Sequence, residues 1–252
     1  APELGGARAW GVWLIAVFFV VYYFSFQTGY SIVNYNVQED VGLTIAQVGI
    51  IAALYTWVFA VFQFLSGPLI DRIGARKVLL PAILLVTIGI FVFAGAESFS
   101  VLLISQAFIA LGACAGFVGA GYVGGTWFGW AKFSLMFGLV QFSASLFSAF
   151  NQNLMSWALT VEHWRDLFNY VGGLGIALFV VAFLWLRDPT PVVVSGARGV
   201  GAFLASVLRS MAKVSQSPMV WVAAAIGSLA FGVMLALGVV WGPKLMMARG
   251  LE

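Results

Sequence analysis

Long hydrophobic runs, separated by short polar segments, dominate this sequence. A helix rises about 1.5 Å per residue and the hydrocarbon layer of a bilayer is about 30 Å thick, so about 20 apolar residues cross it. Runs of this length predict membrane-spanning helices rather than the roughly 10-residue alternating strands of a membrane barrel. Seven runs lack Asp, Glu, Lys, Arg and His: Trp10–Asn34, Ile45–Ser66, Val78–Gly95, Val101–Phe128, Phe133–Ala158, Leu167–Leu186 and Met219–Trp241.

The composition supports a membrane location and excludes several functions. Of the 252 residues, 62% are hydrophobic and 8% are charged, whereas soluble domains carry about 25% charged residues. So few charges cannot cover a water-facing surface, which excludes a soluble enzyme and a nucleic-acid-binding protein. We therefore expect no enzymatic activity, no cofactor and no nucleic-acid partner. One cysteine, Cys114, and one histidine, His163, exclude a disulfide framework and a Cys/His metal cluster.

The basic residues predict the orientation in the membrane. With a cytoplasmic N-terminus, inner segments hold nine Lys and Arg residues and outer segments hold three, while most acidic residues lie outside. This bias favours a cytoplasmic N-terminus and an external C-terminus. We expect the membrane to be the bacterial inner membrane. The inner set is Arg8, Arg72, Arg76, Lys77, Lys132, Arg187, Arg198, Arg209 and Lys213, and the outer set is Arg165, Lys244 and Arg249.

One long polar segment divides the chain. Residues 187–217 form a predicted cytoplasmic linker between six runs in residues 1–186 and the seventh in residues 218–252. Apolar residues recur there at helical spacing opposite basic ones, which predicts an amphipathic helix. That helix either lies on the inner leaflet or packs on the cytoplasmic ends of the bundle, and both interpretations stay open. The apolar positions are Val200, Phe203, Leu204, Val207, Leu208 and Met211, and the basic ones are Arg209 and Lys213.

A short basic segment between the second and third runs carries the clearest motif. It reads Gly67-Pro68-Leu69-Ile70-Asp71-Arg72-Ile73-Gly74-Ala75-Arg76-Lys77. Gly67 allows close approach of two helix ends, Asp71 can accept from backbone amides or pair with an arginine, and Gly74 permits a left-handed turn. Arg72, Arg76 and Lys77 would anchor the inner face. An ordinary basic hairpin is the alternative interpretation.

The pattern G-x-L-x-D-R-x-G-x-R/K-K closely resembles the signature loop of the major facilitator superfamily. Three shorter matches agree: Trp164-Arg165, Arg187-Asp188-Pro189 and Arg249-Gly250-Leu251. The resemblance implies an all-α membrane bundle of six transmembrane helices in 3+3 inverted repeats, followed by the first helix of a second bundle. Since members of this family usually have twelve spans, we expect the rest of the second bundle to be absent from this sequence. The gating motif implied for this family comprises Gly67, Asp71, Arg72, Gly74, Arg76 and Lys77.

The resemblance also implies a function. We expect a monomeric secondary active or facilitative transporter in the lipid bilayer, moving a small polar or anionic organic solute by rocker-switch alternating access. H⁺, Na⁺ or a counter-substrate would provide coupling. Two departures bear on this: Gln106 stands where many members have arginine, and Phe133–Ala158 lacks the proline typical of drug/proton antiporters. The competing interpretation is a non-transporting receptor or scaffold built on the same bundle.

Uncharged polar residues inside the runs are candidates for substrate contact, because buried amides and hydroxyls need partners or water. One face of the first run and one face of the fifth carry such residues at helical spacing. Hydrogen bonding between helices, worth about 0.6 kcal/mol each, is the alternative. The candidates are Tyr23, Gln27, Tyr30 and Asn34 in the first run, Gln141 and Ser145 (with Ser148 and Gln152) in the fifth, and Tyr55 and Tyr122 elsewhere.

Two further patterns have structural interpretations. In the fourth run, Gly112, Gly116, Ala120 and Gly124 recur at every fourth position, which predicts a surface where another helix approaches closely. His163 lies beside Glu162 and Asp166 in an outer loop. It is either a solvated loop residue or a pH-sensing group.

Overall fold

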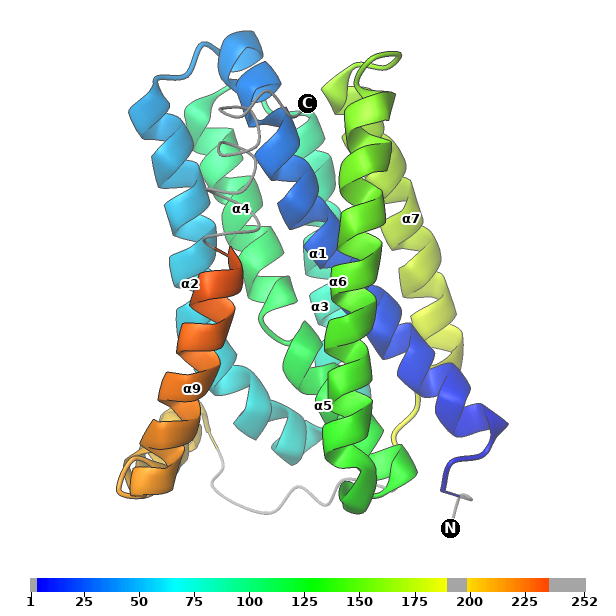
Figure 1. Ribbon diagram of the computed structural model, residues 1–252, viewed down its shortest axis with the longest axis vertical. Helices are drawn as coiled ribbons and strands as arrows, with labels where there is room; N and C mark the ends of the chain where they lie inside the picture. Colours follow the sequence, from blue (N-terminus) through cyan, green and yellow to red (C-terminus); the bar gives the residue numbers. More distant parts are fainter. Residues whose placement is uncertain (1–3, 190–198, 236–252) are drawn as a thin grey trace. The chain divides into compact units, whose positions relative to one another are not determined.

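The computed structural model describes residues 4–189 and 199–235, all of them in helices or short connections (Figure 1). The chain divides into two units, residues 1–195 and residues 196–252. The helices of the first unit are α1 (Ala7–Val41), α2 (Ile45–Ile73), α3 (Ala75–Ala94), α4 (Phe99–Ala113), α5 (Gly116–Phe128), the 3-10 turn η1 (Trp130–Lys132), α6 (Phe133–Ala158) and α7 (Trp164–Trp185). The second unit contains α8 (Val200–Val214) and α9 (Pro218–Leu235).

Six helical segments of the first unit are long and apolar enough to cross a membrane, which agrees with the first six predicted runs. The fourth segment is made by α4 and α5 together, over Phe99–Phe128. In the second unit, α8 occupies the position predicted for the amphipathic helix, and α9 covers the seventh run as far as Leu235. Residues 236–241 of that run, and the Arg249-Gly250-Leu251 match, lie outside the described residues.

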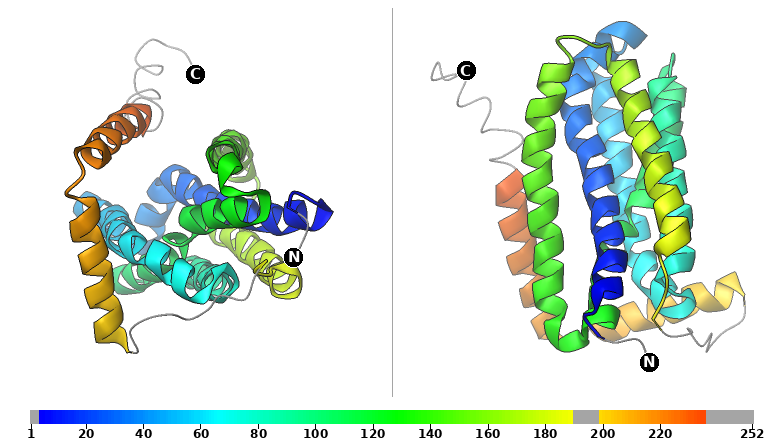
Figure 2. Two further views of the ribbon diagram at one scale, coloured as in Figure 1. Left: turned by 90° about the horizontal axis from the view of Figure 1, so that it is seen from below. Right: turned by 90° about the vertical axis from the view of Figure 1, so that its right-hand side faces the viewer.

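The first helix is the central element of the first unit. In its most hydrophobic stretch of 18 residues, 67% of the residues are buried. The corresponding share is 11% for α2 and 22% for the segment that contains α6. It packs against α5, α6 and α7, as the view along the helices shows (Figure 2, left). In largely exposed helices such as α2 and α6, the exposed face must meet lipid, water or another protein element.

Aromatic rings join three of these helices near the C-terminal end of α3. The Phe93 ring centroid lies 5.3 Å from that of Phe26 in α1 and 5.0 Å from that of Phe168 in α7. Tyr30 and Trp164 also lie edge-on to Phe93, at 5.7 and 5.5 Å. Edge-to-face pairs each contribute about 0.5–1.5 kcal/mol beyond burial, so this cluster holds α1, α3 and α7 in register.

The small residues predicted to form one contact surface in the fourth run meet three different helices. A Cβ added at Gly112 would overlap Ala82 of α3, and one at Gly116 would overlap the ring of Tyr23 in α1. A Cβ at Gly124 would lie 2.9 Å from Cβ of Met136 in α6. The predicted close approach of another helix is therefore confirmed. It involves α3, α1 and α6 rather than one helix, because the span is interrupted after Ala113 and packs against neighbours on several sides.

Candidate functional site

The basic motif is almost entirely helical. Helix α2 continues through Pro68 to Ile73, and α3 begins at Ala75, so Gly74 is the only residue between them. Its φ of +92° and ψ of 158° lie in a region that residues with a Cβ rarely adopt. Gly74 thus adopts a positive φ at the turn, whereas the surrounding segment forms helix ends rather than a loop. We call this end of the bundle, which the basic residues predict to be cytoplasmic, the inner end.

The N-terminus of α3 is capped by a residue from the other end of the first unit's sequence. Asp188 Oδ1 accepts from the backbone N–H of Ala75 at 2.9 Å, and Oδ2 accepts from that of Arg76 at 3.3 Å. Partial burial raises the pKa of the Asp188 carboxyl above its ordinary value, although the Ala75 N–H and the Lys77 charge oppose the change. Asp188, rather than Asp71, therefore accepts the backbone amides at this turn.

Arg76 fastens the same turn to the end of α7. One guanidinium nitrogen donates to the Phe183 carbonyl at 2.8 Å, and the other donates to the Leu186 carbonyl. The guanidinium carbon also lies 5.5 Å from the centre of the Phe183 ring. Positive charge at a helix C-terminus is favourable, because the last carbonyls have no partner within the helix. We call Arg76 and Asp188 with these partners the inner latch.

The other motif residues lie around the inner latch without joining it. Asp71 and Lys77 are exposed, and within the described ranges Asp71 makes no hydrogen bond or ion pair. Arg72 is half-buried. A Cβ added at Gly67 would lie 3.7 Å from Cγ1 of Val118, an ordinary contact, so this conformation does not require glycine there.

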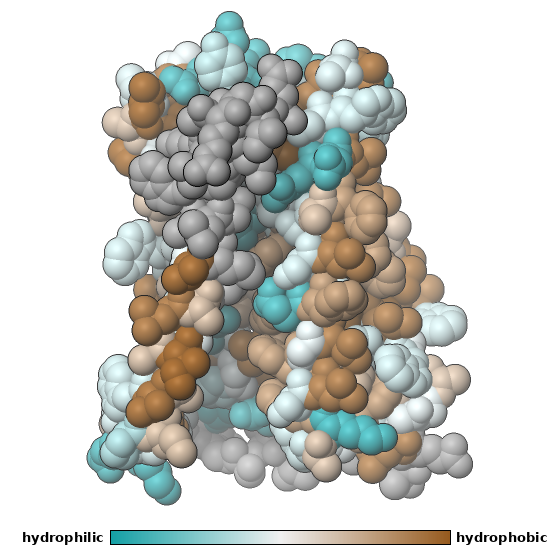
Figure 3. All heavy atoms as spheres, viewed as in Figure 1, coloured by the Kyte–Doolittle hydropathy of each residue, from teal (hydrophilic) through white to brown (hydrophobic). Residues whose placement is uncertain are grey.

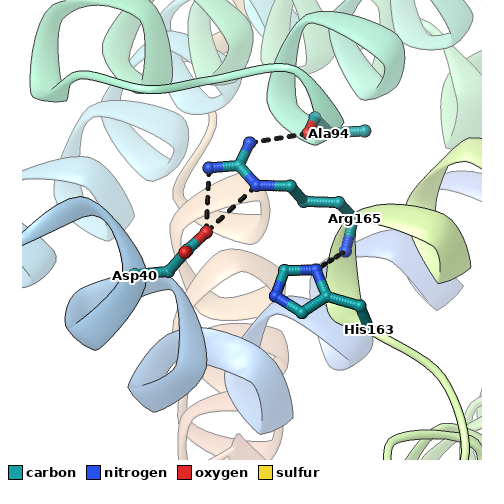
Figure 4. Close-up of polar contacts among 4 residues, drawn as sticks. All are labelled: Asp40, Ala94, His163 and Arg165. Carbon is teal, nitrogen blue, oxygen red and sulfur yellow. Dashed lines mark hydrogen bonds and ion pairs between the residues drawn. The ribbon is translucent and has the colours of Figure 1, made fainter.

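Arg165 makes a comparable connection at the opposite, outer end (Figure 4). Its guanidinium contacts Asp40 Oδ2 at the end of α1 through Nε and Nη2, at 3.0 and 2.8 Å. It also donates through Nη1 to the Ala94 carbonyl at the end of α3, at 2.9 Å, and lies over the Trp164 ring. His163 Nδ1 accepts from the Arg165 amide at 3.4 Å, which caps α7. We call Arg165 and these partners the outer clamp.

An open pocket of about 300 Å³ lies beside the outer clamp. Its lining combines the ends of α1 and α6 with the start of α7, and three of its side chains are carboxylates. None of the predicted substrate-binding residues is among its lining residues, which are Asn36, Glu39, Asp40, Leu159, Glu162, His163 and Trp164.

The four polar residues predicted along α1 lie in different environments. Tyr23 is 1% exposed, Tyr30 and Asn34 are half-buried, and Gln27 is exposed. The stripe therefore starts in the core and reaches the surface further along the helix. Sequence analysis missed the residue that links this helix to α6: Asn151 donates to the Ser25 carbonyl at 2.9 Å. The sequence does place the amide side chain of Asn151 inside an apolar run, and such a residue is expected to need a hydrogen-bond partner.

The predicted face of α6 is also mixed. Gln141 is half-buried and donates to the exposed Ser145 at 3.1 Å, within the same helix. Ser148 is buried and Gln152 is exposed. In Figure 3, hydrophilic side chains gather along one edge of α6, whereas the surface over its other edge and over α7 is mostly hydrophobic. Only the second surface suits contact with lipid tails.

The predicted tyrosines separate into two places. Tyr55 is 6% exposed and stacks on Phe59, which also contacts Tyr23, so these two tyrosines lie together. Tyr122 is half-buried beside Trp130 and lies near the carboxylates of Asp71 and Asp188 at the inner end. The structure therefore brings Tyr23 and Tyr55 together and leaves Tyr122 with the motif. Gln106 is buried, and its side-chain nitrogen has no hydrogen-bond partner among the described residues.

Comparison with known families decides the classification. The model of the Major Facilitator Superfamily matches residues 14–252, nearly the whole chain. The chain belongs to the Major Facilitator Superfamily. Membership and the six membrane-length helices together make it an integral membrane protein with an all-α bundle, as the motif at residues 67–77 predicted.

Several curated superfamily proteins are similar to this chain. The probable galactarate/D-glucarate transporter GudP of Escherichia coli (strain K12) is 24% identical over 186 residues, covering 69% of this chain and 40% of the relative. The probable sulfoacetate transporter SauU of Cupriavidus necator is 20% identical, covering 69% and 41%. The quinolone resistance protein NorA of Staphylococcus aureus is 26% identical, covering 63% and 40%. The chain thus spans about two fifths of the length of these relatives.

Proposed function

We propose that this superfamily chain forms part of a secondary active or facilitative transporter that moves a small organic solute by alternating access. The observation that carries the proposal is the polar but uncharged surface on α1 and α6, in a unit whose other exposed surfaces are largely apolar. Polar groups at membrane depth require a protein partner, water or a solute. Among the described residues, Gln27, Asn34, Gln141 and Ser145 are exposed or half-buried candidates on this surface.

A polar or anionic metabolite is the proposed substrate class. Two relatives bear names that refer to organic anions, galactarate or glucarate and sulfoacetate. Another relative is named for quinolone resistance, but α6 lacks the proline that the resemblance associates with drug/proton antiporters. We also propose a cytoplasmic N-terminus. Gly5 N–H donates to the Trp127 carbonyl, and Trp127 Nε1 donates to the Arg187 carbonyl, so the first described residues lie at the end that carries the basic motif. Basic residues favour the cytoplasmic side of a membrane.

The two arginine contacts support a rocker-switch movement. The inner latch and the outer clamp fix α3 to α7 at both ends, and the aromatic cluster around Phe93 holds α1 against both. A unit so connected moves as a body rather than helix by helix. In this proposal Asp71 and Lys77, which are exposed at the inner end, contact whatever element closes the pathway there.

Solute uptake into proteoliposomes tests the proposal. The full chain would be reconstituted and supplied with radiolabelled polar and anionic metabolites, with empty liposomes as the control. Accumulation above that control of at least one solute is the expected result. A protein that is inserted and folded but moves no member of the panel would instead support the receptor or scaffold interpretation.

A further inference from the structure

The fourth membrane span is interrupted within the bundle. Helix α4 ends at Ala113 and α5 begins at Gly116, with Cys114 and Ala115 between them (Figure 1). The regular ladder resumes with the bond from Gly119 N to the Ala115 carbonyl, at 2.8 Å. Within the part of the chain that the structure describes, no side chain caps α5. As at any helix N-terminus, the amides of its first turn have no carbonyl acceptor within the helix and carry partial positive charge.

Two buried tyrosines lie at this interruption. Tyr23 and Tyr55 are 1% and 6% exposed, and neither hydroxyl has a hydrogen-bond partner among the described residues. The Tyr23 ring lies against Gly116, which has room for it only because glycine lacks a Cβ. The Phe117 amide faces the Tyr23 hydroxyl without reaching normal hydrogen-bond geometry, and both hydroxyls lie near the Cys114 side chain. Buried hydroxyls without partners are uncommon in native proteins and require an explanation.

The side chains of the two tyrosines and the first amides of α5 offer neutral hydrogen-bond donors at the interruption. Two phenolic O–H groups and the amides of a helix N-terminus face the same place, and the membrane runs of the sequence contain no Lys or Arg. Helix N-termini at the ends of interrupted membrane helices suit anionic groups, because the amides and the helix dipole both favour negative charge. A carboxylate or sulfonate would accept from both hydroxyls and from the amide of Phe117.

We propose that Tyr23, Tyr55 and the N-terminus of α5 bind the anionic group of the transported solute, a deepening that rests on the proposed function. The site is closed in this conformation, since both rings are buried. The two-residue interruption is the point at which the fourth span can bend to admit the solute. Solutes with at least one carboxylate or sulfonate are therefore preferred over neutral analogues of the same size.

Matched substitutions and matched probes test this site. Tyr23→Phe and Tyr55→Phe each remove one hydroxyl and keep the ring, while Tyr170→Phe, at an exposed position of α7, is the control. The thermal stability of each purified full-length protein would be titrated with D-glucarate, sulfoacetate and the neutral polyol glucitol. Because a hydrogen bond to a charged group contributes substantially, each of the first two variants should raise the apparent Kd for the anion about tenfold or more. The control should leave it unchanged.

The outcomes separate this site from the proposed function. Stabilisation by an anion but not by glucitol, weakened in both tyrosine variants, supports the site. Equal anion affinity in all variants, or no stabilisation by either anion, overturns it, whether or not proteoliposomes take up other solutes. Anion binding that depends on the two hydroxyls, together with an absence of uptake, would retain the site and reject transport.

Discussion

Arg76 and Arg165 are each the second residue of a helix, and each donates to carbonyl groups at the C-terminal end of the other's helix. Arg76 of α3 bonds the Phe183 and Leu186 carbonyls at the end of α7, and Arg165 of α7 bonds the Ala94 carbonyl at the end of α3. These helices are antiparallel, and they are the third and the sixth of the six membrane-length segments. They are therefore the last helices of the two inverted three-helix repeats that the resemblance implies. This reciprocity is what an inverted repeat predicts, and it ties the groups together at both ends of the bundle.

Arg76→Gln should weaken the inner latch. The substitution removes a charge-assisted pair of bonds to the Phe183 and Leu186 carbonyls, which then keep, among the described residues, only their contacts with Arg187. Such bonds contribute about 1.5–3 kcal/mol. We expect a lower Tm in detergent for the variant. Lys132→Gln is the control, because Lys132 is exposed in η1 and is not part of the inner latch. Equal Tm losses in both variants would show that the latch bonds do not stabilise the bundle.

Asp188 should make stability depend on pH. Burial raises the pKa of its carboxyl in the folded protein, so the folded state binds the proton more tightly than the unfolded chain does. This contribution is complete below the ordinary value of 3.8 and is lost as pH rises through the folded-state pKa. In Tm measurements from about pH 3.5 to about pH 7, wild type should lose stability relative to Asp188→Asn, whose amide does not titrate in this range. A constant difference would contradict the prediction.

The ion pair of the outer clamp should contribute modestly. Arg165 and Asp40 are 25% and 37% exposed, and the coupling energy of such pairs is about 0.2–1 kcal/mol and falls with added salt. A double-mutant cycle with Arg165→Gln and Asp40→Asn measures it. We expect the arginine variant to be the more destabilised, because it also loses the Ala94 bond and the contact with Trp164. Equal losses would mean that these two contacts add nothing.

Gly112→Ala should destabilise the bundle by about 1–3 kcal/mol, the usual cost of overpacking. The new Cβ would overlap the Ala82 carbonyl oxygen, which is backbone and cannot rotate away. Gly138→Ala in α6 is the control, since nothing lies within 4 Å of a Cβ there. That variant should be neutral or stabilised by up to about 1 kcal/mol through helix propensity. Unfolding in denaturant would compare the two.

Asp71→Asn should slow transport without affecting insertion or stability. Its carboxylate is exposed and unbonded among the described residues, so its removal costs the first unit nothing. If the motif acts in gating, the initial rate of solute uptake into proteoliposomes should fall at least several-fold while Tm stays constant. An unchanged rate would remove Asp71 from the gating mechanism.

Hydropathy predicted the six membrane helices of the first unit well, because insertion in lipid depends on apolar length. It could not predict the interruption after Ala113, since Cys114 and Ala115 keep ordinary right-handed dihedral angles and no proline marks them. The cap on α3 could not be predicted from the sequence for a different reason. Asp188 and Ala75 are 113 residues apart, and only the packing of α7 on α3 brings them together.

The candidate site was only partly predictable for the same reason. Tyr23, Tyr55 and Tyr122 are equivalent by residue type, yet the first two meet at the interruption and the third lies beside the motif carboxylates. Helical spacing places residues on one face of their own helix, whereas the neighbours of that face depend on packing between helices. Gln27 and Tyr23 share a stripe, but one is exposed and the other is in the core.

The single residue between α2 and α3 sets how the largely exposed α2 can move. Because α3 is secured to α7, a tilt of α2 has to come from rotation about the two backbone torsions of Gly74, or from bending of α2 itself. A side chain at that position would narrow the accessible torsional range. The angle between α2 and α3, and with it the position that α2 takes within the moving unit, therefore depends largely on the torsions of one amino acid.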